Sequence, residues 1–377
     1  MGSIHELVVT GGPGGGKTTG LSSIQSWFMN RGFRVFIVPE VATMFFSSGV
    51  QDIGKIAAEN PELYINIQRR ILGMQMAYRK EFLNLAKYFD GPSIIIYDRG
   101  PMDGAAYMPL EDFEKMMREE NLTLHDVRDS FDGVIHLVTA ADGAEEYYTL
   151  ENNKARRETP EEARALDVRT QNAWCGHPHM KIIDNSTGFD LKMKRMIAAI
   201  ARIVGIPVPL EIERKFLLAS VPDLVHELKN IQIVNIEQMY LGGVYDGQAR
   251  IRKRVASDGS ATYYHTVKTP TNAARVRYEK ESRIDAGEYL RLRSFQQEKT
   301  APIEKTRYCF VWRQQYFELD VFYTPSGLVL LEVELTEEND VVDLPHFNIL
   351  REVTDDSRYM NSTLAGYAYR SIAGLGI

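Results

Sequence analysis

The sequence predicts two domains of different class, an α/β domain followed by an α+β domain. Up to about Gly205, short apolar runs alternate with long helical patterns, which is typical of a parallel sheet with helices on both faces. After Pro207 and Pro209 the pattern changes to successive strands with charged residues at every second position. We therefore predict an α/β domain over residues 1–205, a linker at 206–209 and a domain with an antiparallel sheet over 210–377.

The composition indicates a globular protein without a general affinity for nucleic acid. The 377 residues, 44% of them hydrophobic, suffice for two or three cores. Lys and Arg total 44 against 51 Asp and Glu, so a net charge of -7 gives no general attraction to nucleic acid. Cys175 and Cys309 lie far apart and without zinc-type spacing, and no apolar run is long enough to span a membrane. We expect a cytoplasmic protein.

Five apolar runs are the expected strands of the first sheet, at residues 7–9, 35–38, 94–97, 134–138 and 182–183. Residues 61–89 form the best helical pattern between them, because Asn60 suits the N-cap and Pro61 the first helical position.

A glycine-rich phosphate-binding loop follows the first strand and precedes a helix that starts near Lys17. Residues 11–18 match the pattern G-x-x-x-x-G-K-[ST]. We expect the backbone N–H groups of residues 12–17 to converge on a phosphate of GTP or ATP, with the positive end of the helix dipole behind them. Lys17 would reach the β- and γ-phosphates, and Thr18 would bind Mg²⁺. The predicted nucleotide-binding residues of this loop are Gly12, Pro13, Gly14, Gly15, Gly16, Lys17, Thr18 and Thr19.

Two acidic residues lie at the ends of predicted strands beside this loop. Asp98 ends the third strand, where a carboxylate can hold the water shell of Mg²⁺, and Arg99 follows it. The Asp-Arg pair resembles the nucleoside and nucleotide kinase branch of such proteins, in which the arginine faces the acceptor and a carboxylate at the place of Glu40 orients its hydroxyl. The alternatives are a helix N-cap for Asp98 and a solvated loop acid for Glu40.

Two further segments are candidate parts of this site. Arg156 and Arg157 precede a capped helix that begins near Thr159, and they would either close over the phosphates or form a solvated charged face. Asn185, after the fifth strand, is placed to contact a nucleobase, although turns of this composition are common.

In the second domain, charged residues alternate with apolar ones along successive strands, so one face of the sheet is charged. An ordinary sheet with one wet face explains such alternation in any single strand. A closed barrel would instead direct the charges inward, where lysines and arginines suit polyphosphate oxygens and paired carboxylates suit Mg²⁺ or Mn²⁺. The charged sets are Glu211, Glu213 and Lys215; Arg250, Arg252 and Arg254; Lys305 and Arg307; Glu318 and Asp320; and Glu332 and Glu334.

The Glu-x-Glu-x-Lys sequence at residues 211–215 resembles the hallmark of the CYTH, or triphosphate tunnel metalloenzyme, family. The resemblance covers about residues 210–366. It implies an eight-stranded antiparallel tunnel that binds a triphosphate compound with a divalent metal. The metal-side positions that it implies are Glu211, Glu213, Asp320, Glu332 and Glu334. The phosphate-side positions are Lys215, Arg250, Arg252, Lys268, Lys305 and Arg307.

The two halves together resemble the TRPL translocation defect GTP-binding protein family, in which a NadR-like AAA domain with the phosphate loop precedes a CYTH domain. The residues that carry this resemblance are the loop, residues 39–43 (PEVAT) and residues 97–104 (YDRGPMDG). The resemblance implies guanine-nucleotide binding and an interaction with acidic phospholipid or phosphoinositide at membranes.

Three functions follow as alternatives. The first is a nucleotide-binding protein whose second domain binds, and hydrolyses, a metal-complexed triphosphate. The second is a small-molecule kinase that uses Glu40 and Asp98 with Lys17, Arg99, Arg156 and Arg157. The third is a nucleotide-regulated adaptor that binds an acidic phospholipid headgroup.

Overall fold

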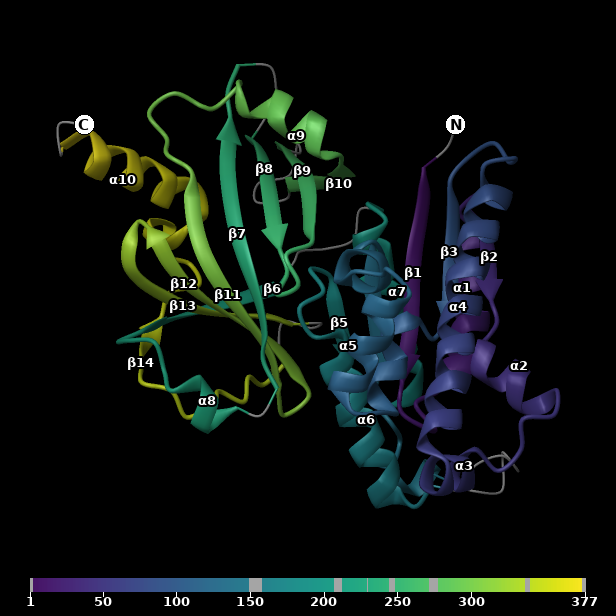
Figure 1. Cartoon of the computed structure of the whole chain (residues 1–377). Helices are drawn as coiled ribbons and strands as arrows, with labels where there is room; N and C mark the ends of the chain where they lie inside the picture. The colour runs from purple at the N-terminus through teal and green to yellow at the C-terminus, as the bar shows by residue number, and fades with distance from the viewer. Residues whose placement is uncertain are drawn as a thin grey trace. The chain divides into compact units, whose positions relative to one another are not determined.

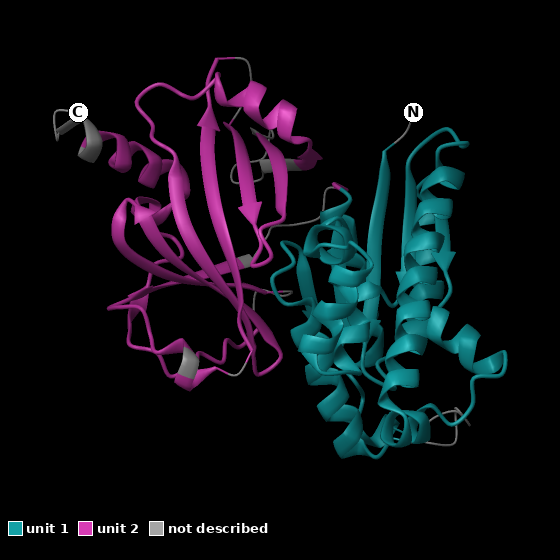
Figure 2. Cartoon of the chain, in the orientation of Figure 1, with its two compact units in different colours: residues 1–204 teal, residues 205–377 magenta. Residues whose placement is uncertain are grey.

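The chain forms two compact units, Met1–Val204 and Gly205–Ile377 (Figure 2). The computed structural model describes residues 3–148, 158–206, 212–228, 230–243, 248–270, 277–335 and 340–374. Most of the predicted linker and the predicted arginines at 156 and 157 lie outside these residues. None of the described helices combines the length and the apolar character that a membrane crossing requires.

Unit 1 is built on a five-stranded parallel sheet in the order β2-β3-β1-β4-β5 (Figure 1). Its strands are β1 (Ile4–Gly11), β2 (Arg34–Val38), β3 (Ser93–Asp98), β4 (Gly133–Leu137) and β5 (Met180–Ile183). All five predicted strands are present, and the central residues of β1, β3 and β4 are fully buried, as expected for a sheet covered on both faces, while those of the edge strand β2 are partly buried. Because all strands run the same way, their carboxyl ends and the loops that follow them meet at one edge.

Helices connect these strands in the predicted alternation. They are α1 (Lys17–Met29), α2 (Val41–Ser47), α3 (Ile53–Glu59), α4 (Pro61–Ala86), α5 (Leu110–Glu119), α6 (Pro160–Trp174) and α7 (Phe189–Ile203), with a 3-10 turn η1 (Pro101–Ala106) after β3. Asn60 caps α4 as predicted, since its side chain accepts the Leu63 N–H at 3.0 Å. Thr159 and Glu162 form a capping box at the start of α6. Both α4 and α6 contact η1.

Unit 2 contains an antiparallel sheet in the order β10-β9-β8-β7-β11-β12-β13-β6-β14. Its strands are β6 (Ile212–Leu218), β7 (Gln232–Leu241), β8 (Gln248–Val255), β9 (Ala261–Pro270), β10 (Arg277–Ile284), β11 (Ile303–Trp312), β12 (Gln315–Thr324), β13 (Ser326–Leu335) and β14 (Ile349–Glu352). The eight strands that we expected become nine, because the short β14 pairs with β6. Within the described residues β10 and β14 are the two edges, so closure into a tunnel stays a prediction.

One face of this sheet is apolar, and helices cover part of it. Phe310 and Phe317 stack with ring centroids 5.6 Å apart in the largest cluster of buried side chains. Tyr289 of α9 (Ala286–Arg293) packs on β7 and β8 on this face. Leu364 of α10 (Asn361–Gly374) packs in a third cluster with Tyr240 and Phe322, which lie opposite Arg250 and Lys305 and so share the charged face. Because successive side chains of a strand alternate, the charged residues lie on the other face.

Replacing Phe310 with Ala should lower the free energy of unfolding of unit 2 by about 3–5 kcal/mol, because it removes a fully buried ring and leaves a cavity. Urea denaturation of the whole chain, followed by far-ultraviolet circular dichroism, would measure this change. Phe295, which is 41% exposed, is the matched control, and Phe295→Ala should cost about 1 kcal/mol or less. Equal losses in the two variants would contradict this packing.

Candidate functional site

The glycine-rich loop lies tightly against the end of β4 and against α6, and each of these two contacts requires a glycine. A Cβ atom on Gly15 would lie 2.6 Å from the Leu137 carbonyl oxygen. One on Gly12 would lie 2.4 Å from the Asp167 carboxylate. Gly16, with φ of 90°, precedes the first residue of α1. The loop therefore has the strand–loop–helix context that phosphate binding requires.

Asp167 of α6 holds the start of the loop in place through a hydrogen bond. Its carboxylate is 2% exposed and accepts the Gly12 N–H at 2.7 Å and the Thr139 N–H at 3.1 Å. His136 Nε2 lies 3.0 Å away, and Gln171 Nε2 donates to the other oxygen at 2.8 Å. Burial alone would raise the pKa of Asp167, but His136 and the two N–H groups outweigh it and lower the pKa.

This contact corrects one expectation. We predicted that the N–H groups of residues 12–17 all point at phosphate, but Gly12 donates to Asp167 and Gly15 donates to the Gly12 carbonyl at 3.3 Å. The start of the loop is thus anchored to the protein. Sequence reasoning missed Asp167, because an aspartate in the middle of a polar helix is ordinarily exposed and nothing local marks it as buried.

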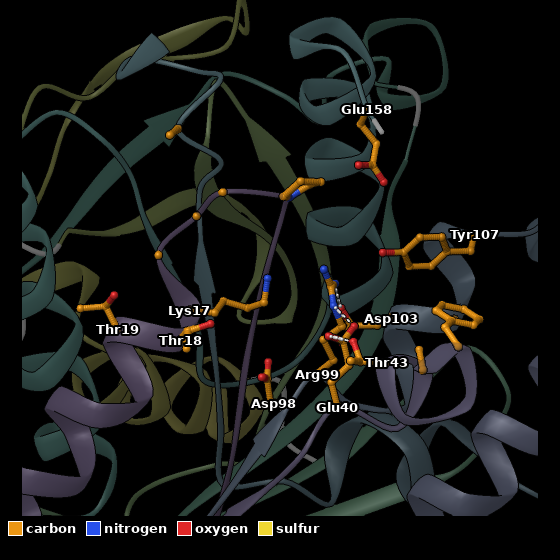
Figure 3. A pocket seen from close by; sticks show the side chains of 18 of the residues that line it. Lys17, Thr18, Thr19, Glu40, Thr43, Asp98, Arg99, Asp103, Tyr107 and Glu158 are labelled. Atoms are coloured by element: carbon orange, nitrogen blue, oxygen red, sulfur yellow. Dashed lines mark hydrogen bonds and ion pairs between the residues drawn. The ribbon is translucent and has the colours of Figure 1, made fainter. Parts of the chain in front are cut away.

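Lys17, Thr18 and Asp98 lie together at the mouth of the loop (Figure 3). Burial, with a smaller contribution from the Arg99 charge, lowers the pKa of Lys17 to about 8. Burial also raises the pKa of Asp98. One carboxylate oxygen of Asp98 is buried and makes no hydrogen bond within the described residues, which leaves an acceptor that a hydrated cation would satisfy. A carboxylate and a threonine hydroxyl are ligands that Mg²⁺ prefers, so Thr18 and Asp98 fit this ion.

Glu40 and Arg99 form an ion pair beside Lys17, and Asp103 is a second carboxylate partner of Arg99 (Figure 3). Arg99 Nε lies 2.8 Å from Glu40 Oε1, and its terminal nitrogen lies 3.2 Å from Asp103 Oδ1. Thr43 donates to the other Glu40 oxygen at 2.8 Å. Glu40 is thus more than a solvated loop acid, which was one of the alternatives.

Asp103 is a functional-site residue that we had quoted only as part of a motif. It is 3% exposed, accepts the Gly100 N–H at 2.7 Å and also accepts the Thr10 hydroxyl. Because η1 begins at Pro101 with Gly100 as its N-cap, Asp98 does not cap the following helix.

These residues line a cavity of about 1540 Å³ in unit 1. Asn185 lies in its wall, but its amide is already engaged: the nitrogen donates to Thr139 O at 2.8 Å and Asp142 O at 2.6 Å, and the oxygen accepts from Lys192 at 2.7 Å. A contact between Asn185 and a nucleobase stays a prediction. Arg156 and Arg157 lie outside the described residues.

In unit 2, the strand register brings cations and carboxylates together on the charged face. Lys215 lies opposite Glu332, and Lys215 Nζ is 2.7 Å from the Glu332 carboxylate. Arg307 lies opposite Asp320 and contacts it at 2.6 and 2.7 Å. Arg307 also lies 3.0 Å from Glu332 and contacts Glu318.

These contacts set the charge states of the buried groups. Burial opposes ionisation of Glu332, but Lys215, Lys305 and Arg307 outweigh it and hold the pKa of Glu332 well below its ordinary value. Lys305 contacts Asp320, yet burial is the larger effect and lowers the pKa of Lys305. Asp320 and Glu332, which the resemblance placed on the metal side, therefore serve as counter-ions to the cations in this structure.

The remaining predicted metal-side residues fit a divalent cation better. Glu213 and Glu334 lie opposite each other on β6 and β13, and like charges in this arrangement repel unless a cation lies nearby. Lys215 is 3.1 Å from Glu213. Within the described part of the chain, no three metal-binding side chains converge, and Glu211 lies outside that part. Glu213 and Glu334 supply carboxylate oxygens, the ligands that suit Mg²⁺ or Mn²⁺.

The arginines of β8 have uncharged neighbours across both adjacent strands. Arg250 lies opposite Tyr240 and Thr266, and Arg252 lies opposite Gln238 and Tyr264. Arg252 donates to the Gln238 amide oxygen at 3.3 Å. Burial, followed by the charge of Arg250, lowers the pKa of Arg252. The β8 arginines thus lie close enough for their charges to repel one another, and the Glu281 carboxylate partly offsets this effect at Arg252.

Lys268, the last predicted phosphate-side residue, lies on β9 opposite Gln248 of β8. The structure therefore places Lys215, Lys305 and Arg307 in one ion-pair network and Arg250, Arg252 and Lys268 on neighbouring strands.

Replacing Asp167 with Ala should weaken Mg²⁺–nucleotide binding at least about tenfold, because the buried N–H groups of Gly12 and Thr139 lose their acceptor at about 1–3 kcal/mol each. Titration with a fluorescent GTP or ATP analogue would measure it. Asp190, an exposed acid in the first turn of α7, is the control, and Asp190→Ala should bind as the wild type does. Unchanged binding in Asp167→Ala would show that the loop holds its shape without this anchor.

Comparison with known proteins finds relatives of two kinds. The family model described as an AAA domain matches residues 6–192. An inorganic triphosphatase of Acetivibrio thermocellus is 37% identical over 163 residues, which are 43% of this chain and 96% of that protein. One from Nitrosomonas europaea is 36% identical over 160 residues, 41% of this chain and 96% of that protein.

A solved crystal structure of an inorganic triphosphatase is also similar, at 34% identity, with 41% of this chain and 97% of that chain covered and a TM-score of 0.31. The chain carries an AAA domain over residues 6–192, and through the match over about 43% of its length it belongs to the family of CYTH-type inorganic triphosphatases.

Proposed function

We propose that unit 1 binds GTP or ATP with Mg²⁺ and that unit 2 binds and hydrolyses a metal-complexed triphosphate. The order of the two domains agrees with the resemblance to the TRPL translocation defect GTP-binding proteins, so GTP is our first choice of nucleotide.

The proposal for unit 1 is carried by the phosphate loop and the unsatisfied oxygen of Asp98 beside it. The loop presents backbone N–H groups and Lys17 to phosphate oxygens. Lys17 and Arg99 lie among three carboxylates, those of Glu40, Asp98 and Asp103. A magnesium complex held through Thr18 and Asp98 would place its cation against the Asp98 carboxylate and its phosphates against Lys17.

The proposal for unit 2 is carried by the cations that the strand register gathers on one face of the sheet, Lys215, Lys305 and Arg307 with the arginines of β8 on neighbouring strands. We assign the match with the inorganic triphosphatases to this unit, because Glu213 and Lys215 belong to the Glu-x-Glu-x-Lys sequence. Arg250 and Arg252 have uncharged residues directly opposite on β7 and β9, and arginines are suited to bind phosphate oxygens.

In the reaction, the residues of this face orient the triphosphate and take up charge. A divalent cation at Glu213 and Glu334 would neutralise the phosphates and lower the pKa of water. Lys215 and Arg252 would hold the terminal phosphoryl and stabilise the charge that develops as its bridging bond to the rest of the triphosphate breaks. Asp320 and Glu332 keep Lys305 and Arg307 in place through their ion pairs.

Phosphate release from inorganic triphosphate, GTP, ATP and thiamine triphosphate, with Mg²⁺ or Mn²⁺, tests the proposal for unit 2. We expect Arg252→Gln to raise the KM for the favoured substrate at least about tenfold, which corresponds to about 1.4 kcal/mol, and to raise the melting temperature because it relieves repulsion with Arg250. Lys253→Gln, one residue along β8 on the opposite face, should leave KM unchanged. A parallel change of KM in both variants would show that the phosphate lies elsewhere.

Nucleotide binding by unit 1 should weaken at alkaline pH because Lys17 must be charged to bind phosphate. Its pKa in the folded, free protein is lowered to about 8, so above that pH it must take up a proton on binding. The apparent Kd for GTP should rise by up to about tenfold per pH unit above about pH 8. Lys17→Arg stays charged and should show a flat profile, and Lys17→Ala should bind weakly at every pH. A wild-type profile as flat as that of Lys17→Arg would contradict the role of Lys17.

The burial that lowers this pKa also has a consequence for stability. Because the unfolded chain keeps Lys17 protonated up to its ordinary pKa of 10.5 and the folded chain does not, the contribution of Lys17 to stability increases with pH between about 8 and 10.5. Stability and nucleotide affinity should therefore change in opposite directions over this range.

A further inference from the structure

The cavity of unit 1 extends to both sides of the phosphate loop. In the sheet order, β1 lies between β3 and β4, so the loop after β1 separates the segments that follow β2 and β3 from those that follow β4 and β5. Glu40 and Arg99 line the cavity on the first side, and Asn185 and Phe189 line it on the second. The base of a nucleotide bound at the loop can therefore lie on either of two sides.

The charges around Lys17 decide between these sides. After burial, the groups that most affect the pKa of Lys17 are Arg99, Glu40 and Asp98, and all three end or follow β2 and β3. Figure 3 shows Thr19 and the Glu40–Arg99 pair on opposite sides of Lys17. Because Lys17 would hold the terminal phosphates, those phosphates face the β2–β3 side, and the sugar and base are directed past Thr19 to the β4–β5 side.

An aromatic ring lies against the phosphate loop on the β4–β5 side. It belongs to Phe189, the first residue of α7. A Cβ atom on Gly16 would lie 2.8 Å from this ring and 3.9 Å from the Met193 Cε atom. A Cβ atom on Gly20 of α1 would lie 3.1 Å from the Met196 sulfur. The two glycines thus let α1 and α7 pack closely, and this packing fixes the position of the ring beside the loop.

One part of the Phe189 ring is packed, and the rest is open to the cavity. Phe189 is 48% exposed and lines the cavity, whereas Met193 and Met196, further along α7, are buried. An exposed apolar side chain is ordinary by itself, and Leu191 is 53% exposed outside the described lining of the cavity. Phe189 differs from Leu191 because its ring is held against the loop and faces the space where the base is expected.

The polar side chains that follow β5 on this side already have partners within the protein. The Asn185 amide is bonded through both its nitrogen and its oxygen. The Ser186 hydroxyl donates to Asp184 at 2.6 Å and accepts from Arg195 at 3.1 Å. The Thr187 hydroxyl accepts from Arg195 at 3.3 Å. These side chains make the wall rigid, and the face of the neighbouring ring is the surface that it offers to a base.

We propose that the base of a nucleotide bound by unit 1 stacks on the ring of Phe189, and that this contact makes unit 1 prefer purine to pyrimidine nucleotides. The inference rests on the proposed nucleotide binding by unit 1. Stacking on an aromatic side chain uses the flat face that every base has, and its strength depends on the overlap of the two surfaces. Guanine and adenine, with two fused rings, cover more of the phenylalanine than cytosine and uracil do.

Filter binding of α-labelled GTP, ATP, CTP and UTP to the full chain, on ice with Mg²⁺, tests this inference. The binding that remains in Lys17→Ala is subtracted, so that only unit 1 is measured. We expect Phe189→Ala to raise the Kd for GTP and ATP at least about fivefold and the Kd for CTP and UTP less, which removes the purine preference. Phe189→Tyr keeps a ring and should bind as the wild type does, and Phe189→Leu should bind as Phe189→Ala does. Leu191→Ala is the matched control and should leave all four Kd values unchanged.

Imidotriphosphate, a non-hydrolysable analogue of inorganic triphosphate, separates stacking from support of the loop. It has no base, so its inhibition constant against labelled GTP should differ less than about twofold between the wild type and Phe189→Ala. Equal weakening of GTP and imidotriphosphate would overturn the inference, because the ring would then only support the loop. Unchanged GTP binding in Phe189→Ala, or equal binding of all four nucleotides by the wild type, would also overturn it. Absence of any nucleotide binding that depends on Lys17 would refute the proposed function of unit 1 and this inference together.

Discussion

A buried carboxylate at the base of the phosphate loop determines the geometry of unit 1. Asp167 binds the loop at Gly12 and the end of β4 at Thr139. The helix that carries it also reaches the other side of the cavity, since Trp174 Nε1 donates to Asp103 at 3.3 Å. A buried charge is tolerated only with its partners in place, so displacing α6 would disturb the loop and the Arg99 pair together. The phosphate loop and the Arg99 ion pair are therefore both held in place by α6.

In unit 2 a larger set of buried charges also needs partners, and the kind of cross-strand neighbour differs from one strand to another. On β11, β12 and β13, Arg307 contacts three carboxylates, and these groups compensate one another inside the protein. On β8, the cross-strand neighbours of Arg250 and Arg252 are uncharged. The ion pairs on β11, β12 and β13 fix the positions of their side chains, and the β8 arginines are the cations that we propose for binding phosphate.

The sequence predicted local features well and cross-strand partners poorly. The loop, the five strands and the caps at Asn60 and Thr159 follow from residues near one another in the chain, and the structure confirms them. The alternation of charged and apolar residues along the chain predicted which face of each strand is charged. It could not tell that Glu332 lies opposite Lys215, since that depends on strand register, nor that β14 adds a ninth strand. Asp167 and Asp103 act through contacts 155 and 93 residues away, which no local pattern encodes.

The two candidate sites present carboxylates to a metal in different ways. In unit 1, Glu40 and Asp103 contact Arg99, and one oxygen of Asp98 beside Lys17 makes no hydrogen bond within the described residues. In unit 2, Asp320 and Glu332 contact Lys305 and Arg307, while Glu213 and Glu334 lie opposite each other on β6 and β13. On our proposal, a divalent cation would therefore satisfy a single carboxylate in unit 1 and relieve the repulsion between two carboxylates in unit 2.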